Sequence, residues 1–287
     1  MKTIAFLLLI VNSTSELISQ ELQPPDTLVP PLILWQHSVV GALGVTQVSY
    51  NDWAQGGENN FSYNMNVQGK SVYEDITLLW SNSYKFSFGQ TKIGDQDLRK
   101  NDDRIELESV GTWKLGSYIN PYVAATLKTQ FALGYQYDAK GNATAVSKFF
   151  DPGYLTQSIG TGYQLIPAVR TRVGAALREI MTSEFTRYSD DPQTPEVEKV
   201  KVEDGLESVT DLQWKIDENV LLTSKLELFS SFRKPENVVV RSDNSITTRI
   251  GKIITLFVEV QIVIDHIVCP RTQVKQTFGI GLNYALL

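Results

Sequence analysis

TFGIGLNYAL, residues 277–286, alternates large apolar side chains with Thr, Gly, Asn or Ala at every second position. Successive side chains of a β-strand point to opposite faces, so this period of two predicts a strand with one apolar face. The same alternation returns in four earlier segments, at residues 123–133, 206–216, 222–232 and 256–264. No convincing helical period is found after residue 36, so we expect an all-β chain.

Alternation and turn residues together predict about twelve strands. We expect these strands at residues 37–50, 59–73, 75–90, 104–115, 119–137, 154–166, 169–185, 203–217, 219–233, 238–251, 253–266 and 271–286. Many of them exceed the roughly 9–11 residues that a tilted strand needs to cross a bilayer. The expected fold is therefore a single antiparallel transmembrane β-barrel of about 12 strands.

The predicted connections alternate in length. Short turns are expected near residues 74, 117, 167, 218 and 251. The other connections are expected to be mostly longer, at 51–58, 91–103, 138–153 and 186–202, with two short exceptions near 234–237 and 267–270. Short periplasmic turns on one rim and longer extracellular loops on the other are typical of outer-membrane barrels. An even number of strands places both ends of the barrel on the periplasmic side.

The first 36 residues do not share this alternation. Met1-Lys2 precedes the apolar run Ile4–Val11, and small and polar residues follow as far as Gln20. This order is that of a secretory signal peptide, so residues 1–20 are predicted to direct export. Residues 21–36 contain two Pro-Pro pairs and are predicted to form a periplasmic linker, which leaves residues 37–287 for the barrel.

Composition excludes several classes of protein. The net charge is −6, from 26 Lys and Arg against 32 Asp and Glu, so a nucleic-acid partner is not expected. A single Cys cannot form a disulfide within the chain, and two His offer few ligands for a metal. The sequence contains no run of 18 apolar residues, so it predicts no membrane-spanning helix. We expect no cofactor.

The aromatic residues test the barrel prediction independently. If the apolar faces point outward, two groups of aromatic side chains fall near the two rims of the wall. The group near the short turns comprises Trp80, Trp113, Tyr163, Trp214 and Tyr284, and the group near the long loops comprises Phe86, Phe88, Tyr135, Tyr137 and Phe232. Paired aromatic girdles are typical of the two membrane–water interfaces, so outer-membrane lipid is an expected partner.

The opposite face of the strands is charged and is expected to line the lumen. The predicted lumen charges are Lys85, Glu106, Glu108, Lys114, Lys128, Arg170, Arg172, Arg178, Asp211, Lys215, Lys225, Glu227 and Glu259. In lipid each would cost about 2–4 kcal/mol at mid-depth, which favours the inward assignment. Two interpretations remain open: the charges pair and fill the lumen, or they line a wet pore.

Catalytic residues are scarce. A lipid hydrolase would need a Ser–His pair with an orienting amide or carboxylate, and only His37 and His266 are available as the base. His37 has no evident partner in the sequence, whereas His266 is expected near the outer rim on the outward face. An interfacial polar side chain is the commoner role for such a histidine, so we expect no enzyme.

Four motifs in order resemble a family of outer-membrane barrels from Bacteroidota, domain of unknown function 3078. They are residues 50–59 (YNDWAQGGEN), 99–103 (RKNDD), 129–135 (TQFALGY) and 147–155 (SKFFDPGYL). Asp52 is inserted between Asn51 and Trp53, and Leu133 replaces a common proline, relative to the family pattern. The resemblance implies a barrel in the outer membrane of a Gram-negative bacterium, and it implies no catalytic residue.

The outer motif residues have a structural interpretation and a functional one. These residues are Asn51, Trp53, Gly56, Gly57, Arg99, Lys100, Asp102 and Asp103. The glycines suit a tight loop, and the charges suit pairing across the rim. The alternative is an outward patch of Trp53, the 93–103 loop and Phe149-Phe150 that recruits a protein partner.

Together these patterns predict a non-enzymatic outer-membrane barrel, either a narrow passive pore or a structural or assembly component. The alternative is a surface binding module that uses the long loops, and a weaker alternative is a lipid hydrolase. The last strand resembles the signal that the barrel-assembly machinery recognises, although Leu287 replaces the usual terminal Phe. That machinery is therefore an expected partner during biogenesis.

Overall fold

The computed structural model describes residues 35–285 except 52, 53, 56, 117, 192, 252, 253 and 267, and for Leu165 and residues 282–285 it describes the backbone only. The predicted signal peptide and residues 21–34 of the predicted linker lie outside the described residues. The first strand begins at Trp35, so the last two residues of the predicted linker belong to it.

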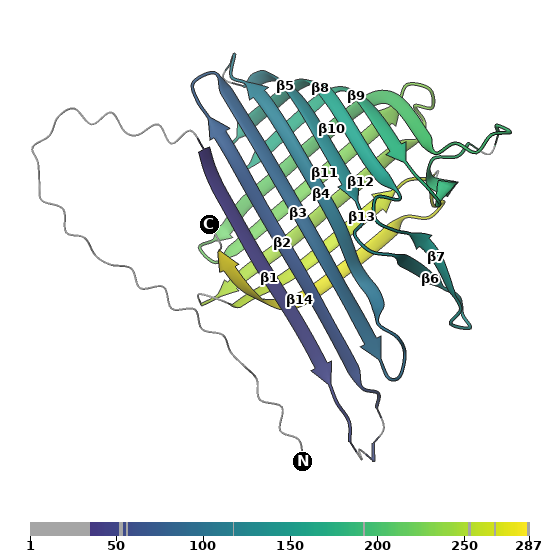
Figure 1. The fold of residues 1–287 in the computed structure, drawn as a ribbon. Coiled ribbons are helices and arrows are strands. Elements are labelled where there is room, and N and C mark those ends of the chain that lie inside the picture. The colour runs from purple at the N-terminus through teal and green to yellow at the C-terminus, as the bar shows by residue number, and fades with distance from the viewer. Residues whose placement is uncertain are drawn as a thin grey trace, which may run out of the picture. The chain divides into compact units, whose positions relative to one another are not determined.

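Twelve antiparallel strands form one closed barrel, which confirms the predicted fold class (Figure 1). The barrel strands are β1 (Trp35–Val48), β2 (Asn60–Glu74), β3 (Leu78–Ile93), β4 (Arg99–Trp113), β5 (Ile119–Thr129), β8 (Gly153–Ile166), β9 (Val169–Met181), β10 (Val200–Asp217), β11 (Val220–Ser231), β12 (Val238–Ile250), β13 (Ile254–Ile264) and β14 (Gln273–Ala285). Each pairs with its neighbours along the chain, except that β5 pairs with β8 and β1 with β14.

The period of two decides which side chains enter the barrel. In β4, Glu106 is 3% exposed and faces inward, whereas its neighbour Leu107 is 46% exposed and faces outward. The same parity runs around the ladder, since Glu106 pairs with Lys85 on β3 and with Lys128 on β5. Alternation therefore produces an apolar outer surface and a charged interior.

Turn lengths define two rims. Five short connections, after β2, β4, β8, β10 and β12, form the short-turn rim. The connections after β1, β3, β5, β9, β11 and β13 form the long-loop rim. The connection after β9 contains one 3-10 turn, Thr186–Tyr188. Among the described residues, no helix is long and apolar enough to cross a membrane.

Two predicted boundaries at the long-loop rim are wrong. Residues 91–103 were expected to be a loop, but β3 continues to Ile93 and β4 begins at Arg99, so only 94–98 connect them. The expected strand 119–137 ends at Thr129, and residues 134–137 form β6 (Gly134–Tyr137), which pairs with β7 (Ala143–Ser147) outside the barrel wall. Alternation continued through residue 133, but hydrogen bonds to Asp103 turn the chain away from the wall.

Within the part of the chain that the structure describes, the seam between β1 and β14 is the shortest ladder of the barrel. β1 pairs with β2 along its whole length, from Trp35 to Val48. Among the described residues, its pairs with β14 run from Val40 to Leu43. The two strands separate toward the long-loop rim, where Figure 1 shows β1 and β14 diverging.

Candidate functional site: the charged interior and the outer rim

An ion pair joins opposite walls of the barrel. Arg104 lies on β4 and Asp243 on β12, and five strands separate β4 from β12 in either direction around the ladder. The guanidinium nitrogen of Arg104 lies 2.5 Å from a carboxylate oxygen of Asp243 and also contacts Glu106 on its own strand. These side chains therefore span the diameter of the lumen.

Lys225 on β11 is the centre of the surrounding network. Its ammonium nitrogen lies 2.6 Å from Glu108, 3.3 Å from Glu227 and 3.6 Å from Glu106. Lys128 on β5 contacts Glu227, and Arg172 on β9 contacts Glu108. Because β4, β5, β9 and β11 belong to different parts of the wall, these pairs cross the interior in several directions.

The members of this network are removed from solvent. Glu106, Glu108, Arg172 and Lys225 all have side chains that are only 4–11% exposed. Charges of this kind are tolerated inside a protein only when each has an opposite charge or a hydrogen-bond partner. The structure meets that requirement, since each of the four contacts at least one opposite charge. The middle of the lumen is thus filled by paired side chains.

A second cluster lies nearer the long-loop rim. The Nε and a terminal nitrogen of Arg178 donate to one carboxylate oxygen of Glu203, at 2.9 and 2.5 Å. Lys201 approaches the other oxygen of Glu203 at 2.9 Å. The guanidinium carbon of Arg178 also lies 4.5 Å from the ring centre of Phe229, an arrangement that suits a cation–π contact. This cluster fills the lumen between the central network and the long-loop rim.

The structure places the predicted lumen charges in three groups. The first group belongs to the central network and the Arg178 cluster, and comprises Glu106, Glu108, Lys128, Arg172, Arg178, Lys225 and Glu227. Lys85, Asp211 and Glu259 are half-buried and share the inward parity of those residues. Arg170 and Lys215 are exposed near the short-turn rim.

The predicted lumen position of Lys114 is wrong. It follows the last residue of β4, and its ammonium nitrogen lies 2.6 Å from Glu74 and 2.8 Å from the carbonyl oxygen of Asp75. It therefore holds two adjacent turns together at the short-turn rim and does not line the lumen. The alternation of β4 continues to Trp113, but the strand ends there, before the inward position of Lys114.

Four interior residues were missed in the sequence: Arg104, Glu203, Arg241 and Asp243. Each has the inward parity of its strand, so continuing the alternation by one or two positions would have found it. The predicted strand began at Arg104, five residues after the observed start of β4 at Arg99. From Arg241 to Ser245 every residue is polar, so no alternation marked the inward parity of Arg241 and Asp243.

At the long-loop rim, three of the family-like motifs meet. The ammonium of Lys100 donates to Asp103 at 2.7 Å, to the Gln130 side chain at 3.1 Å and to the Ala132 carbonyl at 3.0 Å. The Asp103 carboxylate accepts the N–H groups of Phe131 and Ala132, at 2.7 and 3.0 Å. Ser147 donates to Gln130 at 2.7 Å. We call Lys100, Asp103, Gln130 and Ser147 the rim network.

The other outer-motif residues lie around this network. Arg99 places its guanidinium 3.9 Å from the Tyr137 ring centre, and Asp102 contacts Lys275 on β14. All four charges of the 99–103 motif belong to β4, which corrects their predicted loop position. Asn51 is exposed, and Gly57 has a φ of 140° that glycine adopts readily. Trp53 and Gly56 lie outside the described residues.

The aromatic positions largely follow the predicted girdles. Trp80, Trp113, Tyr163 and Trp214 are exposed on the outer face near the short-turn rim, and Trp35 packs against Trp80. Phe86 and Phe88 pack edge-on against Phe131, and Phe232 is exposed just after β11. The Tyr284 side chain lies outside the described part. Tyr135 and Tyr137 are a correction, since they lie on the β6–β7 hairpin and not on the wall.

The two histidines differ in their surroundings. His266 is exposed in the turn after β13, and no partner for its ring is found in the part of the chain that the structure describes. His37 does have a partner, because its Nδ1 lies 2.9 Å from the Ser71 hydroxyl across the β1–β2 ladder. That contact brings residues 34 positions apart together, which no local pattern signals.

The fold and the interior define a closed antiparallel β-barrel with an apolar exterior and a paired, charged lumen. Residues 45–135 match the family described as "Protein of unknown function (DUF3078)", which confirms the predicted resemblance over those residues. Three of the four motifs fall within this match. A comparison with curated protein sequences gave no significant match.

Solved barrels show only a distant likeness. An outer membrane channel from Pseudomonas putida F1 is 14% identical, covers 92% of this chain and 99% of its own, and has a TM-score of 0.39. The translocator domain of the autotransporter NalP from Neisseria meningitidis is 8% identical, with 86% of each chain covered and a TM-score of 0.37. The outer membrane channel DcaP of Acinetobacter baumannii is 8% identical, with 88% and 97% covered and a TM-score of 0.32.

Proposed function

We propose that this chain is a non-enzymatic β-barrel of the outer membrane whose lumen is closed by its own charged side chains. The apolar exterior, the two rims of aromatic residues and the closed ladder support a position in a bilayer. Export by the N-terminal segment and insertion by the barrel-assembly machinery are parts of this proposal. The short-turn rim then faces the periplasm and the long-loop rim faces outward.

The observation that carries the closed lumen is the contact between Arg104 and Asp243. A ring of charges that lined a wide pore would stay on its own wall and leave the axis to water. Here side chains from opposite walls meet at 2.5 Å, and Lys225 and Arg172 reach partners on β4 from β11 and β9. The geometry therefore favours a structural barrel over an open solute channel.

Conductance in a planar bilayer tests this proposal. The refolded wild-type barrel, with folding shown by heat-dependent gel mobility, is expected to give no stable current steps. Removal of both partners of two crossing pairs, Arg104→Ala with Asp243→Ala and Lys128→Ala with Glu227→Ala, is expected to produce steps without leaving either partner of those pairs unpaired.

A matched control uses an ion pair outside the lumen. Arg233 and Asp204 approach to 3.6 Å and are both exposed, so Arg233→Ala with Asp204→Ala should leave the barrel silent. Large stable steps from the folded wild type would overturn the closed lumen and return the chain to the class of passive pores.

A second candidate function is recruitment of a protein partner at the long-loop rim. Phe131, Leu133, Tyr135 and Phe149 all expose large apolar or aromatic side chains there, around the β6–β7 hairpin. Binding that is lost when residues 134–147 are replaced by a short Gly-Ser linker, while the barrel still folds, would support this candidate. A hydrolase has no such support, and labelling by a serine-reactive probe that His266→Ala abolishes would be needed to revive it.

A further inference from the structure

A row of polar side chains crosses the outer wall where apolar ones are expected. His37, Ser71, Asn82 and Ser109 are paired in register across β1, β2, β3 and β4, and all four have outward parity. We call these four residues the polar row. Polar groups on a lipid-facing wall are costly unless they find hydrogen-bond partners, so four in register indicate a specific use.

Some of these groups are satisfied by each other and some are not. His37 Nδ1 lies 2.9 Å from the Ser71 hydroxyl, which lies 3.4 Å from the Tyr84 hydroxyl. The indole N–H of Trp80 donates to Ser109 at 2.9 Å. For the amide of Asn82, no partner is found among the described residues. Asn82 therefore presents free donors and an acceptor at the centre of the row.

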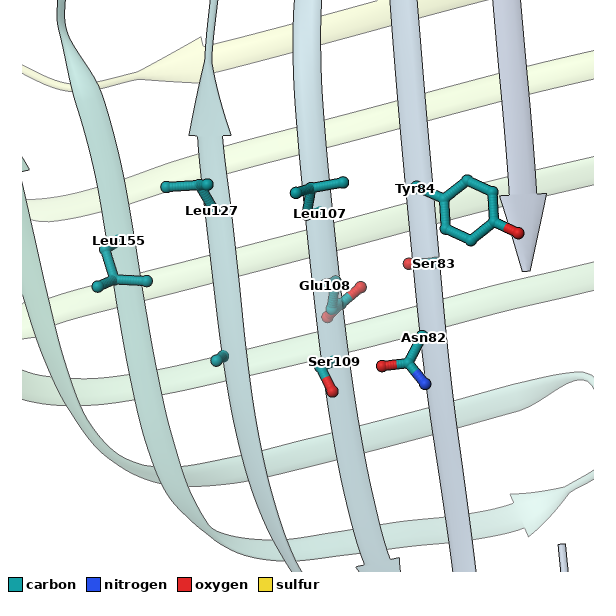
Figure 2. Close-up of a pocket in the computed structure, with 9 residues that line it drawn as sticks. Asn82, Ser83, Tyr84, Leu107, Glu108, Ser109, Leu127 and Leu155 are labelled. Atoms are coloured by element: carbon teal, nitrogen blue, oxygen red, sulfur yellow. The ribbon is translucent and has the colours of Figure 1, made fainter. Parts of the chain in front are cut away.

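A groove of about 340 Å³ adjoins the row on the side of the long loops (Figure 2). The next outward register is apolar, with Leu107, Leu127 and Leu155 side by side on β4, β5 and β8, while the ring of Tyr84 on β3 lies over Gly69 on β2. Ala125 lies one outward position closer to the short-turn rim than Leu127, and its small side chain leaves the groove open. Figure 2 shows Asn82 and Ser109 along the other edge of the groove.

The depth of this groove in the wall is set by the aromatic residues. Trp80 lies one outward position closer to the short-turn rim than Asn82, a step of about 7 Å along a strand, and Trp113 lies two outward positions beyond Ser109. Tryptophan at a barrel rim marks the headgroup level of the bilayer. The polar row then lies at the boundary between headgroups and hydrocarbon, and the leucines lie within the hydrocarbon.

We propose that the groove and the polar row bind one phospholipid of the periplasmic leaflet. An acyl chain lies along Leu107, Leu127 and Leu155, and the ester and phosphate oxygens accept hydrogen bonds from the side-chain amide of Asn82. Polar and apolar registers side by side at interfacial depth match an amphiphile with a headgroup and a chain. This inference rests on the membrane position proposed above.

Ser71 and His37 serve in this site as hydrogen-bonding groups. A hydrolytic pair needs a third group to orient the histidine and donors for an oxyanion. Within the described residues no carboxylate or amide holds His37, and Ser71 lies in β2, which pairs with a strand on each side. The site is therefore built to hold a lipid and not to cleave it.

Native mass spectrometry tests the site. The refolded full chain is inserted into vesicles of phosphatidylethanolamine and phosphatidylglycerol, extracted in mild detergent, and its retained phospholipids are counted. We expect about one per wild-type barrel, and about a tenfold lower occupancy in Asn82→Leu, which loses hydrogen bonds to the headgroup. Ala125→Trp should abolish retention, because the indole fills the groove.

Ala175→Trp is the matched control. Ala175 has outward parity on β9, away from the groove, and is exposed like Ala125, so the same substitution there should retain the lipid. Equal loss in both tryptophan variants, no retained lipid in the wild type, or a second copy of the chain in place of lipid would each overturn the proposal. Failure of the wild type to insert into vesicles would instead overturn the membrane position itself.

Discussion

The interior network and the rim network both start on β4, but they connect the barrel in different ways. The interior joins side chains across the lumen, as when Arg104 meets Asp243, 139 residues along the chain. The rim joins side chains to the backbone of the neighbouring segment, as when Asp103 meets Phe131, 28 residues away. The first contact braces opposite walls, and the second directs the chain out of the wall.

The charged side chains of β4 therefore have two different structural roles. Interior charges are buried, so their energetic effect is large and depends on every partner being present. At the rim, the buried Asp103 carboxylate accepts two backbone N–H groups of one neighbouring segment, so its effect is local to that connection. We therefore expect interior variants to affect the whole barrel and rim variants to affect one loop.

The largest expected effect comes from breaking the interior. Glu108→Leu removes the ion-pair partner of Arg172 and the nearest of the three carboxylates around Lys225, and breaking such buried pairs costs about 3–5 kcal/mol of stability. Urea unfolding in vesicles, followed by tryptophan fluorescence, measures the change. The double variant Glu108→Leu with Arg172→Met should recover part of this loss, because one unpaired charge is removed. A cost below about 1 kcal/mol would show that the network does not brace the barrel.

A smaller effect is expected from the rim. Asp103→Ala removes the acceptor for two backbone N–H groups and for Lys100, with an expected loss of about 1.5–3 kcal/mol. Limited proteolysis should then cut within residues 130–152 faster than in the wild type. Asp97→Ala, in the connection between β3 and β4, is the control and should change stability by less than about 0.5 kcal/mol. Unchanged cleavage in Asp103→Ala would mean that the rim network does not hold this connection.

The smallest effect is expected at the short-turn rim, which belongs to neither network. The N–H groups of Leu78 and Thr77 donate to Asp75 and lower the pKa of its carboxyl from 3.8 to about 2. Because the folded pKa is depressed, this stabilisation is present above about pH 4 and is lost as pH falls toward 2. The melting temperature of Asp75→Ala should therefore lie slightly below that of the wild type at pH 6 and converge with it near pH 2. A constant difference across this range would exclude the carboxylate as the cause.

Particular residues show how far the sequence could be interpreted. The alternation around Glu106 and Leu107 correctly predicted an inward and an outward face, because strand geometry turns a period of two into two sides. The same rule misplaced Tyr135, because alternation persists through residue 133 while hydrogen bonds to Asp103 end the strand at Thr129. The polar row was not predicted, since its four residues belong to separate strands and only their register brings them together.

The sequence by itself determined the β-barrel fold, the number of barrel strands, the charged and apolar faces, and the two unequal rims. These follow from local periodicity and turn residues, which act within a few residues of each other. Only the tertiary structure decided that Arg104 meets Asp243 and that Asn82 lies beside an apolar groove. Such contacts depend on how twelve strands close and in which register, and closure sets distances between residues that the chain keeps far apart.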